Sequence, residues 1–196
     1  MTYARFLLIG LGAIALTASG GHAGAADVAA GKVLAEACAP CHGADGVSQT
    51  PLTPSLAGQP DEFVQWQLVY YRSGARKNDV MQPIAEALSN EEIRNLGAYY
   101  ESLPPPKPAV PLDALVQRGE ELALRHRCRS CHSEDYNGFR AAARLSGQRE
   151  DVLLKALRDY KAGQRVGSGV ASMADTTFDL NDADMQALSR YLAARP

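Results

Sequence analysis

The chain has 196 residues, with 20 Lys and Arg against 22 Asp and Glu and a formal charge of −2. This balance argues against a nucleic-acid-binding protein, and the length allows one ordinary domain or two small ones. Aromatic residues make up only 7% of the chain, so a domain of about 80 residues would need disulfides, a metal or a large cofactor to supplement its core.

Residues 1–25 have the three parts of a secretory signal peptide. Arg5 is the only charge before the apolar run Phe6 to Leu16, and Ala23-Gly24-Ala25 supplies a small-residue cleavage pattern. An apolar run of 11 residues is too short to span a bilayer. We therefore expect cleavage near Ala25, export, and no integral membrane segment in the mature chain.

Four cysteines in an exported protein would usually form two disulfides, but their spacing indicates another use. Cys38-Ala39-Pro40-Cys41-His42 and Cys128-Arg129-Ser130-Cys131-His132 are both Cys-x-x-Cys-His, the attachment signature of c-type haem. A zinc site would need both pairs on one ion, and a thioredoxin-like pair would need an α/β pattern. The sequence therefore predicts two haem c groups, covalently bound through Cys38, Cys41, Cys128 and Cys131.

The two motifs belong to a longer internal repeat. Leu56-Ala57-Gly58-Gln59 returns as Leu145-Ser146-Gly147-Gln148, and the segment from Tyr71 to Arg76 returns as residues 160–165. Between the copies, residues 103–111 contain five prolines, which favour an extended, semi-rigid spacer. We expect one domain over residues 26–103, a linker over 104–111 and a second domain over 112–196.

Each copy carries helix signals and lacks the sustained alternation typical of strands. Pro60 and the acids after it open a helix that runs to about Tyr71. Further helix starts are indicated by Asp113, by Ser89 with Glu92, and by Asn181 with Asp184. The fold class that these signals predict is all-α.

The iron of each haem needs two axial ligands from the chain, and the motif histidines, His42 and His132, supply one each. Met81 and Met173 fall at matching repeat positions, 39 and 41 residues after those histidines, in stretches that look like loops. Met185 has no counterpart in the first copy and is interpreted as a core residue. We therefore expect His42 with Met81 and His132 with Met173 as axial ligand pairs.

Histidine and methionine together leave no open coordination position for a substrate. Such a centre favours the ferrous state and suits one-electron transfer. The ligand sets therefore indicate an electron-transfer protein and not an enzyme.

The Cys-x-x-Cys-His motif, the segment Pro54 to Gln59, and a methionine before a capped helix with a Tyr-Tyr pair resemble class I cytochrome c. The tandem arrangement is similar to the diheme cytochrome c4 family, over essentially all of the mature chain. The resemblance implies two tandem class I cytochrome c domains joined by a Pro-rich linker, with haem propionates towards the domain junction. It also implies that a backbone carbonyl holds each ligand histidine.

The same resemblance implies periplasmic electron delivery within a respiratory chain. The upstream redox partner would be a quinol-oxidising complex or a dehydrogenase, and the downstream partner a terminal oxidase or reductase. The alternatives are a cytochrome subunit of a periplasmic dehydrogenase and a diheme peroxidase.

The second copy departs from the family pattern where Ala143 replaces Pro54, so its histidine is expected to be less firmly held. Arg76 and Arg165 occupy matching positions and are interpreted either as propionate partners or as solvated residues. Domain charge also differs, with 5 basic against 10 acidic residues over 27–103 and 13 against 12 over 112–196. This asymmetry is interpreted either as two solvated surfaces that have diverged or as different docking partners for the two domains.

Overall fold

The computed structural model describes residues 25–108, 110–166 and 171–196. Residues 1–24 of the predicted signal peptide lie outside the described residues. Over these ranges the regular structure is helical, with isolated bridges as the only extended pairings. No helix in the described part of the chain combines the length and apolar character needed to cross a membrane.

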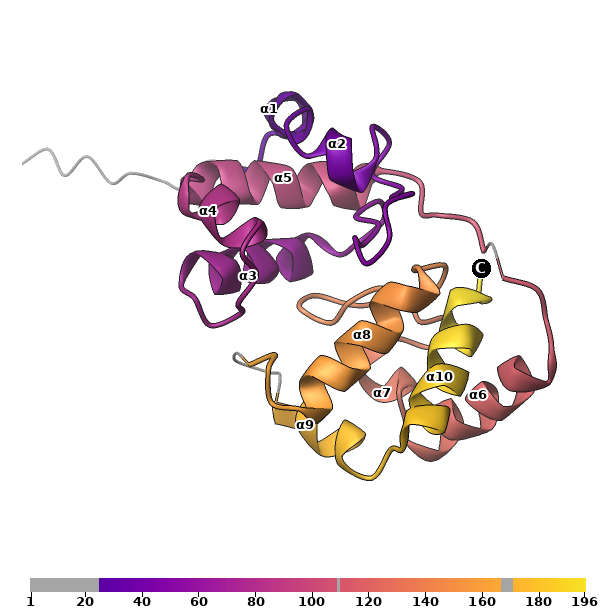
Figure 1. Ribbon diagram of the computed structural model, residues 1–196. Coiled ribbons are helices and arrows are strands. Elements are labelled where there is room, and N and C mark those ends of the chain that lie inside the picture. Colours follow the sequence, from indigo (N-terminus) through magenta and orange to yellow (C-terminus); the bar gives the residue numbers. More distant parts are fainter. Residues whose placement is uncertain (1–24, 109, 167–170) are drawn as a thin grey trace, which may run out of the picture.

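Ten helices in these ranges form two sets of five that follow the repeat (Figure 1). Domain 1 contains α1 (Val28–Ala35), α2 (Ala39–His42), α3 (Asp61–Arg72), α4 (Met81–Glu86) and α5 (Asn90–Ser102). Domain 2 contains α6 (Ala114–Arg125), α7 (Arg129–His132), α8 (Glu150–Lys161), α9 (Ala171–Phe178) and α10 (Asp182–Ala193).

The predicted helix starts are confirmed by side-chain caps. Ser89 Oγ accepts a hydrogen bond from the backbone N–H of Glu92 at 3.2 Å, and the Glu92 carboxylate accepts one from the Ser89 N–H at 2.8 Å. Asn181 and Asp184 form the same reciprocal box at the start of α10. Asp113 accepts from two N–H groups of α6. These bonds satisfy backbone donors that a helix leaves unpaired in its first turn.

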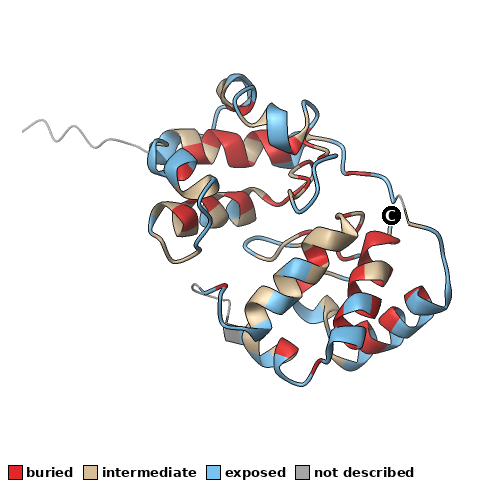
Figure 2. Cartoon of the chain, viewed as in Figure 1, coloured by how far each residue is buried: buried red, intermediate tan, exposed pale blue. Residues whose placement is uncertain are grey.

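Each domain is built around its last helix. In domain 1, α5 packs on α1 and α3, and in domain 2, α10 packs on α6 and α8. Buried residues follow the inner faces of these helices (Figure 2). Met185 is only 4% exposed within the domain 2 core, which confirms its interpretation as a core residue.

Residues 104–108 of the proline-rich linker are irregular and contact both domains. Pro106 is buried, and its carbonyl oxygen lies 2.6 Å from where a Cβ on Gly147 would stand. In domain 1, Cβ of Pro105 lies 2.9 Å from where a Cβ on Gly58 would stand. Both glycines have φ near +68°, so their lack of a side chain serves both the backbone turn and the passage of the linker. The linker is thus packed against the Leu-x-Gly-Gln element of each domain.

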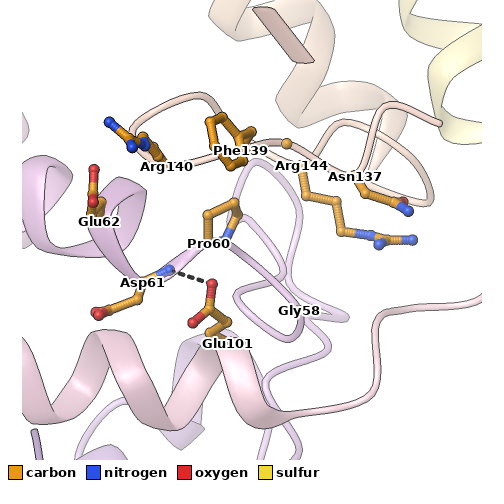
Figure 3. A pocket seen from close by; sticks show the side chains of 10 residues that line it. Gly58, Pro60, Asp61, Glu62, Glu101, Asn137, Phe139, Arg140 and Arg144 are labelled. Carbon is orange, nitrogen blue, oxygen red and sulfur yellow. Dashed lines mark hydrogen bonds between the residues drawn. The ribbon is translucent and has the colours of Figure 1, made fainter. Parts of the chain in front are cut away.

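A cavity of about 400 Å³ lies at the junction of the two domains. Domain 1 lines it with Asp61, Glu62 and other residues, and domain 2 lines it with Arg140 and Arg144 (Figure 3). Acidic residues of domain 1 and basic residues of domain 2 therefore line the same cavity.

Candidate haem sites

The cysteines of each motif lie on one short helix that also carries the histidine. Cys38 precedes α2, and Cys41 and His42 lie on its single turn. Cys128, Cys131 and the last residue of α7 repeat this arrangement. Neither pair of cysteines is joined by a disulfide. Residues three apart on a helix share a face, and both thiols of a motif can therefore reach one porphyrin edge.

The two motif histidines are buried and have a fixed orientation. The Nδ1 atom of His42 lies 2.8 Å from the carbonyl oxygen of Pro54, and His132 makes the same 2.8 Å bond to Ala143. Because a carbonyl can only accept, each Nδ1 carries the hydrogen and each Nε2 keeps a free lone pair. The expected carbonyl partners are thus confirmed. The equal distances give no sign that Ala143 holds its histidine less firmly than Pro54 does.

Burial also keeps both imidazoles neutral. Loss of solvent lowers the pKa of His42 and of His132, and the hydrogen bonds to the backbone carbonyls oppose this only in part. A neutral imidazole with its lone pair on Nε2 is the form that coordinates iron.

The candidate methionine ligands lie on helices, which corrects the expectation that they belong to loops. Met81 is the first residue of α4, and its backbone N–H donates to Oδ1 of Asn78 at 2.8 Å. Its side chain is partly buried against the domain 1 core. Met173 lies on α9 and is also partly buried. Both methionines lie on the helix that packs beside the long helix after the motif, with α4 against α3 and α9 against α8.

Arg76 and Arg165 meet at the domain junction. Their backbones form an antiparallel bridge, and both guanidinium groups donate to Oε1 of Gln67, at 2.7 Å and 2.8 Å. Each also lies over a tyrosine ring of its own domain, Tyr71 at 4.5 Å or Tyr160 at 4.7 Å. The interpretation as freely solvated arginines is therefore wrong. The sequence indicated this pair of arginines but not Gln67, because the second copy has no glutamine at the matching position.

The arginine pair creates a positive site between the domains. Burial and the adjacent charge of Arg165 lower the pKa of Arg76 to about 10. Among the residues that the structure describes, neither guanidinium takes part in an ion pair. The junction thus suits anionic groups such as carboxylates.

The donor set of each domain fits haem c. It consists of two thiols on one helical turn, a buried imidazole with a fixed tautomer, and a partly buried thioether on a neighbouring helix. Soft thioether and neutral imidazole are the ligand types found in low-spin c-type centres.

Two family profiles match the chain. One, described as "Cytochrome C oxidase, cbb3-type, subunit III", covers residues 25–99, and one described as "Cytochrome c" covers residues 116–195. The chain is 35% identical to a thiosulfate dehydrogenase electron acceptor of Thiomonas intermedia, over 86% of this chain and 82% of that protein. It is 30% identical to a cytochrome c4 of Pseudomonas aeruginosa, over 95% and 94% of the two chains.

A solved structure gives the same result. Reduced recombinant cytochrome c4 from Pseudomonas stutzeri superimposes with a TM-score of 0.81 at 28% identity, covering 88% of this chain and 100% of that chain. Together with the two Cys-x-x-Cys-His motifs, these matches confirm the tandem all-α fold and the two covalently bound haem c groups.

Proposed function

The chain belongs to the cytochrome c4 family of diheme electron carriers, and on this premise we propose that it is a periplasmic one-electron carrier in a respiratory chain. Its domains are residues 26–103 and 112–196, joined by the linker 104–111 after removal of the signal peptide. It passes electrons from an upstream dehydrogenase or quinol-oxidising complex to a terminal oxidase or reductase. The Arg5 charge and the apolar run that follows it support export.

The observation that supports this proposal is that each domain has a Cys-x-x-Cys-His turn with a carbonyl-bound histidine, and a methionine on the corresponding neighbouring helix. Cys38 with Cys41, and Cys128 with Cys131, form the thioether bonds. His42 with Met81, and His132 with Met173, would coordinate the two irons. Each haem supplies a reversible one-electron change at its iron.

The residues of the chain make this change fast and exclude other chemistry. The carbonyls of Pro54 and Ala143 hold the imidazoles in one orientation, so little rearrangement accompanies a change of charge. With an imidazole and a thioether both bound, the iron would have no position left for a substrate. Arg76 and Arg165 place positive charge at the junction, where they can bind haem propionates.

The similarity to thiosulfate dehydrogenase electron acceptors supports a dehydrogenase as the donor. The different charges of the two domains support separate docking faces for donor and acceptor. The test is to mix the ferric protein with thiosulfate dehydrogenase and thiosulfate, or with a quinol-oxidising complex and quinol. An increase in the absorbance of the reduced haem in either mixture supports the carrier function. Failure of both donors contradicts it.

The alternative of a diheme peroxidase needs one iron with an open position, which the matched methionines disfavour. Incubating the reduced protein with hydrogen peroxide and a second electron donor distinguishes the two. The carrier proposal predicts no turnover above the background reaction, and sustained peroxide consumption would support the peroxidase.

A further inference from the structure

Two buried glutamines join the domains in a reciprocal arrangement. The side-chain amide of Gln148, in domain 2, donates to the carbonyl of Ser55 at 2.8 Å and accepts from the Ser55 N–H at 2.9 Å. The amide of Gln59, in domain 1, donates to the carbonyl of Arg144 at 2.9 Å and accepts from the Arg144 N–H at 3.0 Å. Gln59 and Gln148 are equivalent in the repeat, as are Ser55 and Arg144, so each domain grips the other at the same place.

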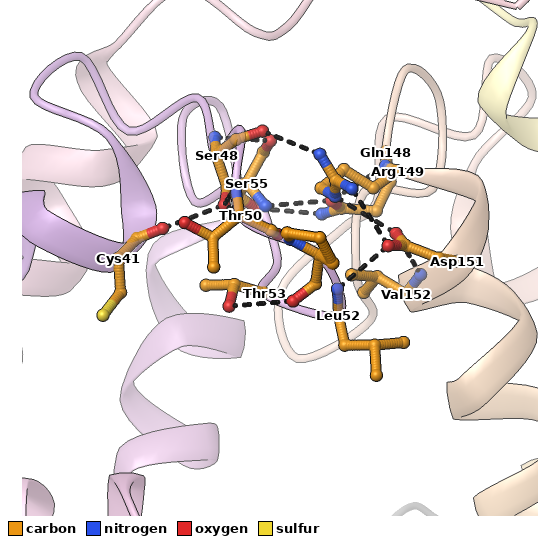
Figure 4. A network of polar contacts seen from close by, with 11 residues as sticks. Cys41, Ser48, Thr50, Leu52, Thr53, Ser55, Gln148, Arg149, Asp151 and Val152 are labelled. Carbon is orange, nitrogen blue, oxygen red and sulfur yellow. Dashed lines mark hydrogen bonds and ion pairs between the residues drawn. The ribbon is translucent and has the colours of Figure 1, made fainter.

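The domain 1 peptide group that bonds to Gln148 also bonds to the motif histidine of domain 1. The Pro54 carbonyl and the Ser55 N–H belong to a single peptide group. Its oxygen accepts from Nδ1 of His42, and its N–H donates to Gln148 of the other domain. A continuous chain of two hydrogen bonds therefore runs from a domain 2 side chain to the domain 1 imidazole. Figure 4 shows the Gln148 contact beside an additional brace from Arg149.

Domain 2 repeats the chain of bonds in the opposite direction. The Ala143 carbonyl accepts from Nδ1 of His132, and the N–H of the same peptide, on Arg144, donates to Gln59. Gln59, Gln148, Ser55 and Arg144 are all less than 9% exposed. Water therefore does not compete for these bonds, and each polarises the next more strongly than it would in solvent.

We propose that Gln148 is a positioning residue for His42, and Gln59 for His132, so that each domain adjusts the axial histidine of the other. Accepting the peptide N–H draws electron density towards the carbonyl oxygen, which then accepts more strongly from the imidazole. A more strongly held Nδ1–H makes Nε2 a better electron donor, and this stabilises ferric iron. Docking of the domains thereby lowers both reduction potentials. The inference rests on the proposed axial roles of His42 and His132.

The test uses Gln148→Leu and Gln59→Leu in the full-length protein with both haems. Each haem is followed by its own methyl resonances in NMR spectra recorded through a redox titration. Gln148→Leu is expected to raise the potential of the domain 1 haem, with about a threefold change in its redox equilibrium constant, or about 28 mV at 59 mV per tenfold. Gln59→Leu is expected to do the same to the domain 2 haem. The effect crosses from the mutated domain to the other one.

A merely structural role would not give this crossed result. If each substitution shifts the haem of its own domain, or shifts neither, the proposal is overturned. Gln65→Leu is the matched control because the Gln65 amide donates to Asp61 within its own domain, at 2.6 Å, and it should shift neither haem. The visible spectra of the variants are compared with that of the wild-type protein. If the spectra are the same and the crossed shift is absent, the glutamine proposal fails while the proposed histidine ligands stand.

A measurement on the unmodified protein covers the case in which a variant fails to fold. The amide hydrogens of Ser55 and Arg144 are expected to exchange with solvent as slowly as those of the core of α5 and α10, because both are buried and bonded across the junction. Exchange at the rate of an exposed loop would show that the bonds are open in solution and would overturn the proposal.

Discussion

Gly119→Ala tests the helix crossing that positions the second haem motif. An ideal Cβ on Gly119 would lie 2.1 Å from the carbonyl oxygen of Ala187 and 2.5 Å from Cβ of Tyr191, both on α10. Ordinary carbon contacts lie at about 3.5–4.0 Å, so α6 and α10 must separate by about 1 Å or more. Gly31 meets Asn95 at the equivalent crossing of domain 1, also at 2.1 Å.

The magnitude follows from two opposing effects. Overpacking costs about 1–3 kcal/mol, and here the upper end applies because the nearest atom belongs to a rigid helix backbone. Replacing glycine by alanine also stabilises the helix by about 1 kcal/mol, because alanine has the higher helix propensity. The net loss of about 2 kcal/mol corresponds to a decrease of about 8–16 °C in the Tm of a domain of this size.

The assay is thermal unfolding of the protein with both haems, followed by far-ultraviolet circular dichroism. The transition of domain 2 should move to lower temperature while that of domain 1 stays in place. Gln117→Ala, on the exposed face of the same helix, is the control and should leave both transitions unchanged. A Gly119→Ala protein that melts with the wild type would refute the close approach of α6 and α10.

Three further predictions concern the sites and the junction. Met81→Ala and Met173→Ala should each allow one carbon monoxide to bind per reduced protein, measured by visible spectroscopy, because each opens one iron position; binding to neither variant would reject these ligands. Although burial opposes it, the hydrogen bonds from Arg149 and from a domain 1 backbone amide hold the pKa of Asp151 below its usual value. The ionised Asp151 carboxylate therefore stabilises domain docking above about pH 4, and this stabilisation is lost as the pH falls further. Small-angle scattering should show the two domains separating as the pH is lowered, and the separation should depend less steeply on pH in Asp151→Asn. Arg165→Gln removes a positive charge from the junction and should lower both potentials, by on the order of 20–40 mV for a charge about 8 Å from iron; unchanged potentials would place the arginines away from the haems.

Much of the fold follows from local signals in the sequence. The capping boxes at Ser89 and Asn181 each depend on two side chains three residues apart, so a short window of sequence contains the whole cause. The Cys-x-x-Cys-His motifs are equally local. Because the sequence is an internal repeat, a site predicted in one copy is also predicted at the matching position of the other.

The short helix at Met81 was missed although its signals are present. Asn78 caps the segment through two backbone N–H groups, and Pro83 lies in the first turn, where no donor is needed. A helix of six residues is too short for hydrophobic periodicity to reveal it.

The glutamine contacts could not be predicted because they join residues that are far apart in the chain. Gln59 pairs with a residue 85 positions later, and Gln148 with one 93 positions earlier. In the sequence both belong to a repeated Leu-x-Gly-Gln element, which indicates a common loop but not which domain its side chain contacts. The meeting of Arg76 with Arg165 depends on the same docking.

Visible spectroscopy of the purified mature protein, with and without carbon monoxide after reduction, tests the ligation of the two irons most directly. Two haems per chain, a sulfur-to-iron charge-transfer band in the ferric spectrum and no change on adding carbon monoxide are the predicted results. A reduced spectrum altered by carbon monoxide, or a ferric spectrum without the sulfur band, would show that histidine and methionine do not close both centres.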